Sequence, residues 1–200
     1  MKPNTNITIT RQYGSGGREI AEIIAKKLKL HRYDRKIVQM AAEQMEETGD
    51  ISNILQDSYT APDSGMGSLG TYAYEAVPFY NKMFREQARV ILEIAKKGSA
   101  VYLGRCADYI LKDLPETYSF YIYADDEFRM ERAKDHYEGH TLKDLNGEDK
   151  NRRRYYEYYT GRTFGDPQIY DLMINTSKIS LEKAADLIIQ YIELRQQAKK

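Results

Sequence analysis

The sequence has few of the residues from which disulfide-bonded and zinc-binding proteins are built. Its 200 residues include one cysteine, three histidines and no tryptophan. The single cysteine, Cys106, cannot form an intramolecular disulfide, and the histidines lack a plausible set of partners for a zinc site. We therefore expect a reducing, cytoplasmic environment and no metal site made of protein ligands.

Net charge and long apolar segments are also absent. Lysine plus arginine equals aspartate plus glutamate, at 30 each, so no overall electric field draws the protein onto nucleic acid or an anionic membrane. No apolar run approaches the roughly 20 residues of a membrane helix, and the polar segment Met1–Asn6 does not have the pattern of a signal peptide. We expect a protein that binds no membrane and no nucleic acid, in which anion binding depends on local clusters.

Short β-branched or apolar segments alternate with segments of helical periodicity. The length favours one domain over residues 1–200. Alternating strands and helices specify an α/β fold, a doubly wound five-stranded parallel sheet with helices on both faces. The strands are predicted at 7–10, 31–34, 99–104, 118–123 and 172–175, and the helices at 17–28, 35–45, 78–97, 107–111, 126–159 with interruptions near Gly139 and Gly147, and 181–194.

One segment departs from this alternation. Between about 48 and 76 the sequence is rich in aspartate, serine, glycine and proline, and it includes Pro62, Gly65, Gly67 and Gly70, which discourage regular structure. We predict a substrate-side insertion over residues 46–80.

A glycine-rich turn joins the first strand to the first helix. In Gly14-Ser15-Gly16-Gly17, several main-chain N–H groups and the positive end of the helix surround one point, an arrangement that binds phosphate. Glycine allows close approach of a ligand and a positive φ. A tight turn that binds no ligand is the alternative interpretation.

The turn differs from the standard phosphate loop, G-x-x-x-x-G-K-[ST], whose lysine reaches the β- and γ-phosphates. In alignment, Arg11 stands at the first glycine and Gly16 at the second, while Gly17 takes the place of the lysine and Arg18 that of the hydroxyl residue. The missing lysine removes a charge that stabilises the transferring phosphoryl group. We predict that Arg11 or Arg18 supplies it. Alternatively, Arg18 pairs with Glu22, one helical turn further on.

Blocks of sequence along nearly the whole chain resemble those of cytidylate-kinase-like proteins, a branch of the nucleoside monophosphate kinases. In that family's order, the matching segments are Ile9–Ile20, Tyr33–Arg35, Gly104–Asp108, Asp149–Arg152, Tyr155–Gly161, Gly165–Asp166 and Asp171–Thr176. The resemblance implies a P-loop kinase fold with a helical lid, here residues 126–165. It also implies ATP and Mg²⁺ as cofactors, nucleotide substrates, and phosphoryl transfer to a nucleoside monophosphate or a similar small phosphorylated acceptor.

The resemblance also implies roles for individual residues. Asp34 and Arg105, with Arg35 as neighbour, would bind the acceptor. The family's Gly-Arg-Asp block is altered here, since Cys106 replaces its aspartate and Asp108 lies two residues on, so Asp108 would bind the acceptor in place of that aspartate. The donor phosphates would lie on Gly14, Ser15, Gly16, Gly17, Arg18 and Glu19, and the lid arginines that clamp the transferring phosphate would be Arg129, Arg132 and Arg152.

Each of these residues also has a structural interpretation. Asp34 could cap the helix that follows it, and Arg105 could form an ion pair within the fold. Arg129 and Arg132, three residues apart on one helix face, could converge on one anion or lie on a solvated face. The mixture of arginines and tyrosines in 152–159 is also found in proteins that bind single-stranded nucleic acid, although a lid helix with packed tyrosines accounts for it better.

Two other functions are compatible with the glycine turn. The missing lysine and the displaced aspartate suggest a nucleotide-binding regulator that has lost catalysis. Dinucleotide binding would use Gly14-Ser15-Gly16, but Glu19 occupies the place of the final glycine in that fingerprint. The acceptor stays open at this level, because base specificity depends on a few side chains in a block that departs from the family pattern.

Overall fold

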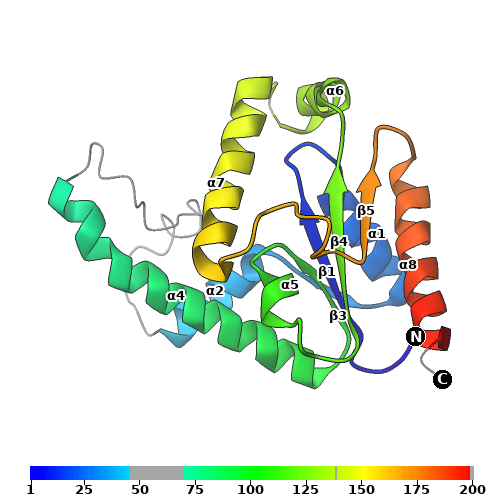
Figure 1. Ribbon diagram of the computed structural model, residues 1–200, viewed down its shortest axis with the longest axis horizontal. Helices are drawn as coiled ribbons and strands as arrows, with labels where there is room; N and C mark the ends of the chain where they lie inside the picture. Colours follow the sequence, from blue (N-terminus) through cyan, green and yellow to red (C-terminus); the bar gives the residue numbers. More distant parts are fainter. Residues whose placement is uncertain (46–69, 138, 199–200) are drawn as a thin grey trace.

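The strands form a single parallel sheet in the order β2-β3-β1-β4-β5 (Figure 1). The computed structural model describes residues 1–45, 70–137 and 139–198, and the backbone alone for residues 70–79. All four pairs of neighbouring strands are parallel, as predicted from the sequence. The strands are β1 (Asn6–Arg11), β2 (His31–Tyr33), β3 (Ala100–Leu103), β4 (Thr117–Tyr123) and β5 (Leu172–Asn175).

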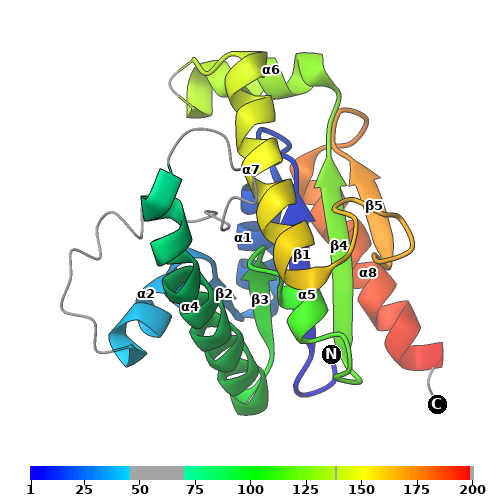
Figure 2. The ribbon, with the colours of Figure 1, turned by 60° about the vertical axis from the view of Figure 1, so that its left-hand side comes forward.

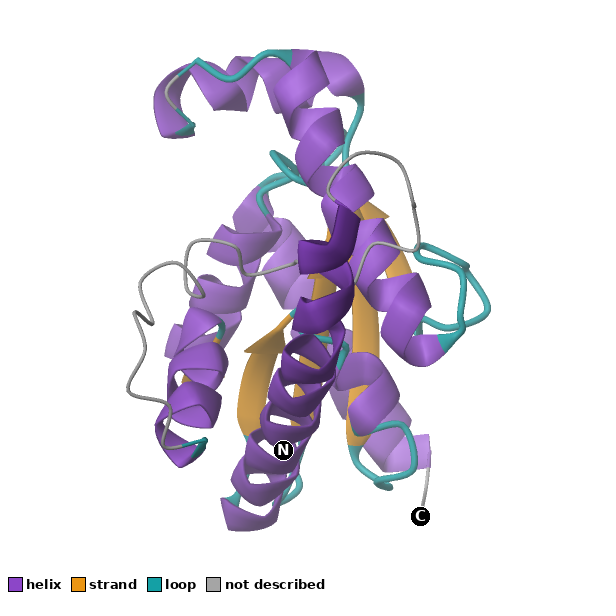
Figure 3. Cartoon of the chain, turned by 90° about the vertical axis from the view of Figure 1, so that its left-hand side faces the viewer, coloured by secondary structure: helices purple, strands orange, loops and turns teal. Residues whose placement is uncertain are grey.

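Helices cover both faces of this sheet, as Figures 2 and 3 show. Successive side chains of a strand point to opposite faces, so Val101 and Leu103 of β3 pack with one helix layer, and Ala100 and Tyr102 pack with the other. The first layer contains α1 (Gly17–Leu28) and α8 (Leu181–Ala198). The second layer contains α2 (Arg35–Gln44), α4 (Gly70–Lys97) and α5 (Ala107–Ile110).

The chain reverses direction across the sheet at β1. From β1 it runs to β2 and β3 on one side, and it then crosses to β4 and β5 on the other. In open parallel sheets, ligands bind outside the carboxyl ends of the strands where the strand order reverses. The loops that follow β1 and β3 are therefore the expected place for a site.

The long helix α4 corrects one prediction from the sequence. The helical spacing of apolar residues predicted a helix that begins at Pro78. Instead α4 begins at Gly70, and its backbone stays helical through Pro78. Within the predicted insertion at 46–80, residues 70–80 are therefore helical, and residues 46–69 lie outside the described residues.

The region predicted to be a lid contains α6 (Asp126–His136) and α7 (Leu142–Thr160). The predicted break near Gly147 is wrong, because α7 runs through that residue. A capping box at its start, in which Thr141 and Asp144 bond to each other's backbone N–H groups, sets where α7 begins. Within the described segments, no helix has the length and apolar character to cross a membrane.

Candidate functional site

The turn between β1 and α1 needs glycine for two reasons. Gly14 and Gly16 adopt φ values of 83° and 81°, which other residues rarely adopt. A Cβ atom on Gly14 would also lie 3.2 Å from the Cβ of Arg129, and one on Gly16 would lie 2.6 Å from Cδ2 of Leu181. The turn is therefore shaped by its packing as well as by the backbone it exposes.

Hydrogen bonds hold this turn to the ends of the neighbouring strands. Gln12 N–H donates to the carbonyl of Ile122 at 2.9 Å, and the buried Ser15 hydroxyl donates to Gln12 O at 2.9 Å. Thr176, just beyond β5, donates its hydroxyl to Ser15 O at 2.7 Å. The Ser15 side chain therefore points into the fold, and the main chain of the turn keeps one position.

The first turn of α1 faces a cavity. The first hydrogen bond of the helix joins Ile20 N to Gly16 O at 3.0 Å, so the N–H groups that precede Ile20 in the helix have no partner within it. These donors and the positive end of the helix dipole favour an anion. Gly16, Gly17 and Arg18 line the cavity at this point.

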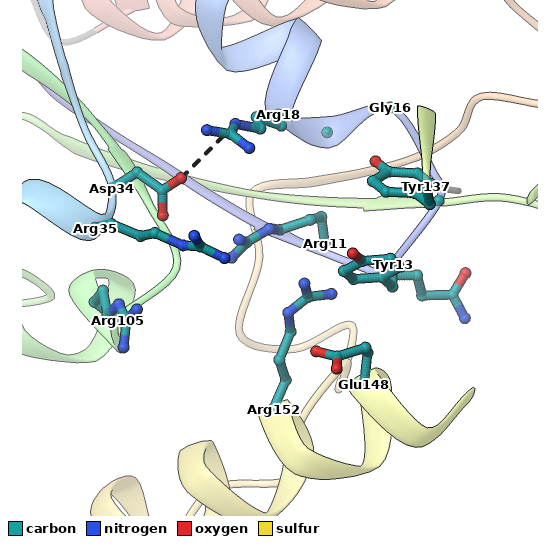
Figure 4. Close-up of a pocket in the computed structure, with 13 residues that line it drawn as sticks. Arg11, Tyr13, Gly16, Arg18, Asp34, Arg35, Arg105, Tyr137, Glu148 and Arg152 are labelled. Atoms are coloured by element: carbon teal, nitrogen blue, oxygen red, sulfur yellow. Dashed lines mark ion pairs between the residues drawn. The ribbon is translucent and has the colours of Figure 1, made fainter. Parts of the chain in front are cut away.

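This cavity, of about 190 Å³, is strongly cationic. Five arginines and two carboxylates line it, a formal excess of three positive charges. Figure 4 shows the arginines entering from different elements: the end of β1, the starts of α1 and α2, the turn after β3, and α7. They are Arg11, Arg18, Arg35, Arg105 and Arg152, and the carboxylates are Asp34 and Glu148. Among the described residues there is no cluster of three or more histidine, cysteine, aspartate or glutamate side chains that could hold a metal ion.

Arg105 reaches the cavity from an unusual turn after β3. Gly104, Arg105 and Cys106 all have positive φ, at 72°, 61° and 55°. For a residue with a Cβ, this conformation costs about 1–2 kcal/mol. The turn buries Arg105 until only 1% of its surface is exposed, at the edge of a cavity that it lines. Strain of this kind is common where a functional side chain must be held in one place.

Arg18 and Asp34 face each other across the cavity. Nε of Arg18 lies 3.9 Å from Oδ2 of Asp34, and 62% of the Arg18 side chain is exposed. The alternative pairing of Arg18 with Glu22 is wrong, because Glu22 accepts a hydrogen bond from Arg32 at 2.8 Å. Asp34 stands at the N-cap position of α2, as predicted, but its side chain makes no capping hydrogen bond. It lies 3.6 Å from Arg32 instead.

Of the three arginines predicted in the lid, only Arg152 lines the cavity. Its guanidinium lies 4.8 Å from the centre of the Tyr13 ring and 3.3 Å from Oδ1 of Asp149. Arg132 is turned away and donates to Glu19 at 2.8 Å. That ion pair also explains why Glu19, predicted to hold the donor, does not line the cavity.

Arg129 is buried and bonded to other parts of the protein. Its Nε donates to the carbonyl of Tyr13 at 2.8 Å, and Nη2 donates to Asp149 at 2.6 Å. Nη1 donates to Asp126 at 3.1 Å and to Asn146 at 3.2 Å. The structure therefore places Arg129 as a link between the glycine turn, α6 and α7, and not at the cavity.

The comparisons with known proteins agree with this architecture. The model of the cytidylate kinase-like family matches residues 6–178. The chain belongs to the cytidylate kinase-like family. A search of the curated proteins finds no match.

Solved structures extend the likeness to P-loop kinases. An uncharacterized protein from Eubacterium ventriosum is 26% identical, with a TM-score of 0.71 over 95% of this chain and 98% of that one. Shikimate kinase from Acinetobacter baumannii, solved with shikimate, has a TM-score of 0.53 at 15% identity over 96% and 94% of the two chains. A gluconokinase from Sinorhizobium meliloti has a TM-score of 0.56 at 11% identity, over 98% of this chain and 95% of that one. At these low identities the two kinases support the fold alone.

Asp108, predicted to bind the acceptor of this cytidylate kinase-like protein, does not line the cavity. Only 3% of its surface is exposed, and its carboxylate accepts a hydrogen bond from the Tyr156 hydroxyl at 2.6 Å. Burial raises the pKa of Asp108, while the bond from Tyr156 opposes this shift. Asp108 thus holds α7 against the turn that carries Arg105.

A small hollow lies behind Arg105. It is bounded by Cys106, Tyr155 and Phe164 and has a volume of about 20 Å³, which is room for about one water molecule. Tyr155 and Tyr156 are buried, so their rings pack inside the protein and are not exposed to stack on bases, whereas Tyr158 is 44% exposed. Burial also raises the pKa of the Cys106 thiol well above its usual value, which makes it unreactive at neutral pH.

Sequence reasoning missed several residues of the site, among them Gln12 and Tyr137, which line the cavity. Tyr13 and Glu148 line the cavity, and Asp149 ties the glycine turn to α7 by accepting from Tyr13 N–H at 2.7 Å. Asp149 stood in a segment that resembles the family, three residues before Arg152 on one helix face. That spacing is the signal that could have identified it.

Proposed function

We propose that this protein is an ATP-dependent phosphotransferase acting on a nucleoside monophosphate or a similar small phosphorylated acceptor. The observation that carries this proposal is the convergence of five arginines on a cavity that is also lined by the glycine turn and the start of α1. Phosphoryl transfer depends on positioning and charge neutralisation more than on covalent help from the protein. A cationic cavity of this kind supports that chemistry.

In this proposal the donor lies on the side of the glycine turn. The backbone of Gly14, Gly16 and Gly17 would hold its phosphates, which fits the N–H groups at the start of α1. Ser15 supports the turn from inside. Arg129 and Arg132, bonded to Tyr13 and Glu19, would position the loop and leave the clamping of phosphate to Arg152.

The acceptor would lie on the side of β3 and α2. Arg105 is buried and Arg35 is exposed, and both line the cavity together with Asp34. Arginine binds phosphate oxygens in a bidentate manner, so these two side chains suit an acceptor that already carries a phosphate. Asp108 would act indirectly, by holding Tyr156 and α7 in place.

The residues present fit Mg²⁺ only through water. Arg18 replaces the usual hydroxyl ligand, and Asp34 and Glu148 are the carboxylates at the cavity. Magnesium keeps several water ligands in such sites, so these carboxylates would hold its water shell. When bound, the ion would neutralise charge on the donor phosphates. We further propose that the protein works in the cytoplasm, where nucleotides are present and a lone cysteine stays reduced.

Transfer of labelled phosphate from ATP tests the proposal. The acceptor panel contains the common nucleoside monophosphates, together with shikimate and gluconate as acceptors without phosphate. We expect transfer to at least one monophosphate, and Arg105→Lys should reduce it while ATP binding persists. Transfer to shikimate or gluconate and to no monophosphate would mean that the acceptor is a hydroxylated carboxylic acid and not a phosphorylated compound.

A second candidate function is a nucleotide-binding regulator without catalysis. The observation that favours it is the altered loop, in which Gly17 and Arg18 replace the lysine and the hydroxyl residue. Calorimetry separates the two functions. Tight ATP binding without transfer, at protein concentrations that would reveal slow turnover, would support the regulator.

A further inference from the structure

Gly17 has no conformational need to be glycine. It occupies the place of the lysine in the standard phosphate loop, and it is not among the glycines with positive φ. It also begins α1, where a residue with a side chain is ordinarily favoured over glycine. Something other than backbone conformation must therefore exclude a side chain at position 17.

That constraint is the side chain of Arg11. A Cβ atom on Gly17 would lie 2.7 Å from Cβ of Arg11 and 3.1 Å from its Cγ. Real Cβ contacts are essentially never as short as 2.7 Å, and Cβ of Arg11 is fixed to the backbone, so it cannot move aside without moving β1. The next neighbour, Cβ of Ile122, would be 3.3 Å away, which is tight but tolerable after a small shift.

Arg11 in turn stands where the standard loop has its first glycine. The two positions have therefore exchanged a glycine and a cation. The standard loop has glycine at the position of Arg11 and lysine at the position of Gly17, whereas this protein has the cation first and the glycine second. The root of the Arg11 side chain takes the space in which a side chain at position 17 would begin, and Arg11 lines the cationic cavity.

We propose that Arg11 is the catalytic replacement for the phosphate-loop lysine and that Gly17 is glycine in order to make room for it. The two positions depend on each other, because Arg11 needs the space that a side chain at position 17 would take. The positive charge at the donor phosphates then comes from the end of β1 instead of from the first turn of α1. This inference rests on the proposed function for the catalytic part of Arg11's role, whereas its steric part is independent of any activity.

Arg18 is the weaker candidate for this role. It aligns with the hydroxyl position, its side chain is mostly exposed, and it forms an ion pair with Asp34 on the acceptor side. An exposed cation gains little from an ionic contact because water screens it. Arg11 is half-buried, and the root of its side chain lies against Gly17 at the start of α1.

The steric half is tested by a thermal-stability cycle on the full chain. Gly17→Ala in the parent should lower Tm by about 5 °C through overpacking. In an Arg11→Gly background the same change should lower Tm by less than about 2 °C, because the obstructing atoms are gone. Equal losses in both backgrounds would overturn the steric exchange. This result does not depend on any catalytic activity.

The charge half is tested by rebuilding the standard loop. Arg11→Gly should reduce kcat about 100-fold, the effect of removing one group that stabilises transition-state charge. The double variant R11G/G17K should recover at least about tenfold, whereas R11G/G17M, a matched variant of similar length without charge, should recover nothing. Arg18→Ala should lose no more than about fivefold.

Binding of tripolyphosphate and of MgATP, measured by calorimetry, keeps this test separate from the proposed function. If the parent binds ATP but transfers no phosphate, the proposed function fails, while the inference still predicts weaker binding in R11G and recovery in R11G/G17K. The inference is overturned if lysine at position 17 performs no better than methionine. It is also overturned if Arg18→Ala loses more than R11G, or if the parent binds neither compound.

Discussion

The two sides of the cavity are built in different ways. On the side where we propose that the donor binds, called the donor side below, the main chain of the glycine turn is held by hydrogen bonds to residues at the ends of β4 and β5, and by Arg129 of α6 and Asp149 of α7, the helices of the region predicted to be a lid. On the side proposed for the acceptor, called the acceptor side below, the cationic groups are the side chains of Arg35 and Arg105, and Arg105 stands on a strained turn. The donor side therefore depends on backbone geometry, and the acceptor side depends on side chains that substitution can alter without rebuilding the fold.

The largest expected effect comes from cutting the tie between the donor turn and the lid. Asp149→Ala removes the acceptor of the Tyr13 N–H bond and a partner of the buried Arg129. Breaking a buried ion pair leaves a charge poorly compensated, so we expect the free energy of unfolding to fall by about 3 kcal/mol. Denaturant unfolding measures this change.

The control for that variant is Lys150→Ala, its exposed neighbour on α7, which should change stability by less than about 0.5 kcal/mol. A loss for Asp149→Ala no greater than for the control would mean that the donor turn does not depend on the lid, and the contrast between the two sides would disappear.

The next effect tests the acceptor side. Arg105→Ala should lower kcat/KM for the acceptor about 100-fold, because the lost group makes charge-assisted bonds to phosphate in a buried setting. The Kd for ATP should change by less than about threefold, since the donor turn is untouched. Steady-state kinetics and calorimetry measure the two quantities, and an equal loss in both would show that the sides are not separate.

A smaller effect measures the strain in the acceptor turn. With φ of 61° at position 105, Arg105→Gly should be more stable than Arg105→Ala by about 1 kcal/mol, because glycine adopts this conformation without a Cβ clash. Both variants lack the same guanidinium, so their difference isolates the backbone. Equal unfolding free energies would show that the turn carries no strain.

The smallest effect is a pH dependence at Asp108. Burial raises the pKa of this carboxyl above its ordinary value of 3.8, so the folded state holds the proton more tightly than the unfolded chain. This contribution to stability is complete below that value and is lost as pH rises through the folded-state pKa. Asp108→Asn should therefore gain stability relative to the parent as pH rises above the ordinary carboxyl pKa of 3.8, and unfolding measured across this pH range in which the variant instead loses stability relative to the parent would contradict the shift.

Much of the fold followed from local sequence. Apolar β-branched segments predicted the five parallel strands, and the glycines at 14 and 16 anticipated the positive φ values that the turn requires. The start of α4 was mispredicted, because the polar, glycine-rich composition that extends to about residue 76 discourages regular structure, yet the helix begins inside that segment at Gly70. There the rest of α4 outweighed the low helix propensity of its first residues.

For the site, too, sequence determined one part and tertiary structure the other. The sequence by itself determined that Arg11 and Gly17 occupy exchanged positions of a phosphate loop, because residue order along one strand and one turn is enough to see it. Only the tertiary structure decided that Arg152 faces the cavity while Arg129 is bonded within the protein. Spacing along a helix sets which side chains share a face, but the direction of that face depends on how α6 and α7 pack over the end of the sheet.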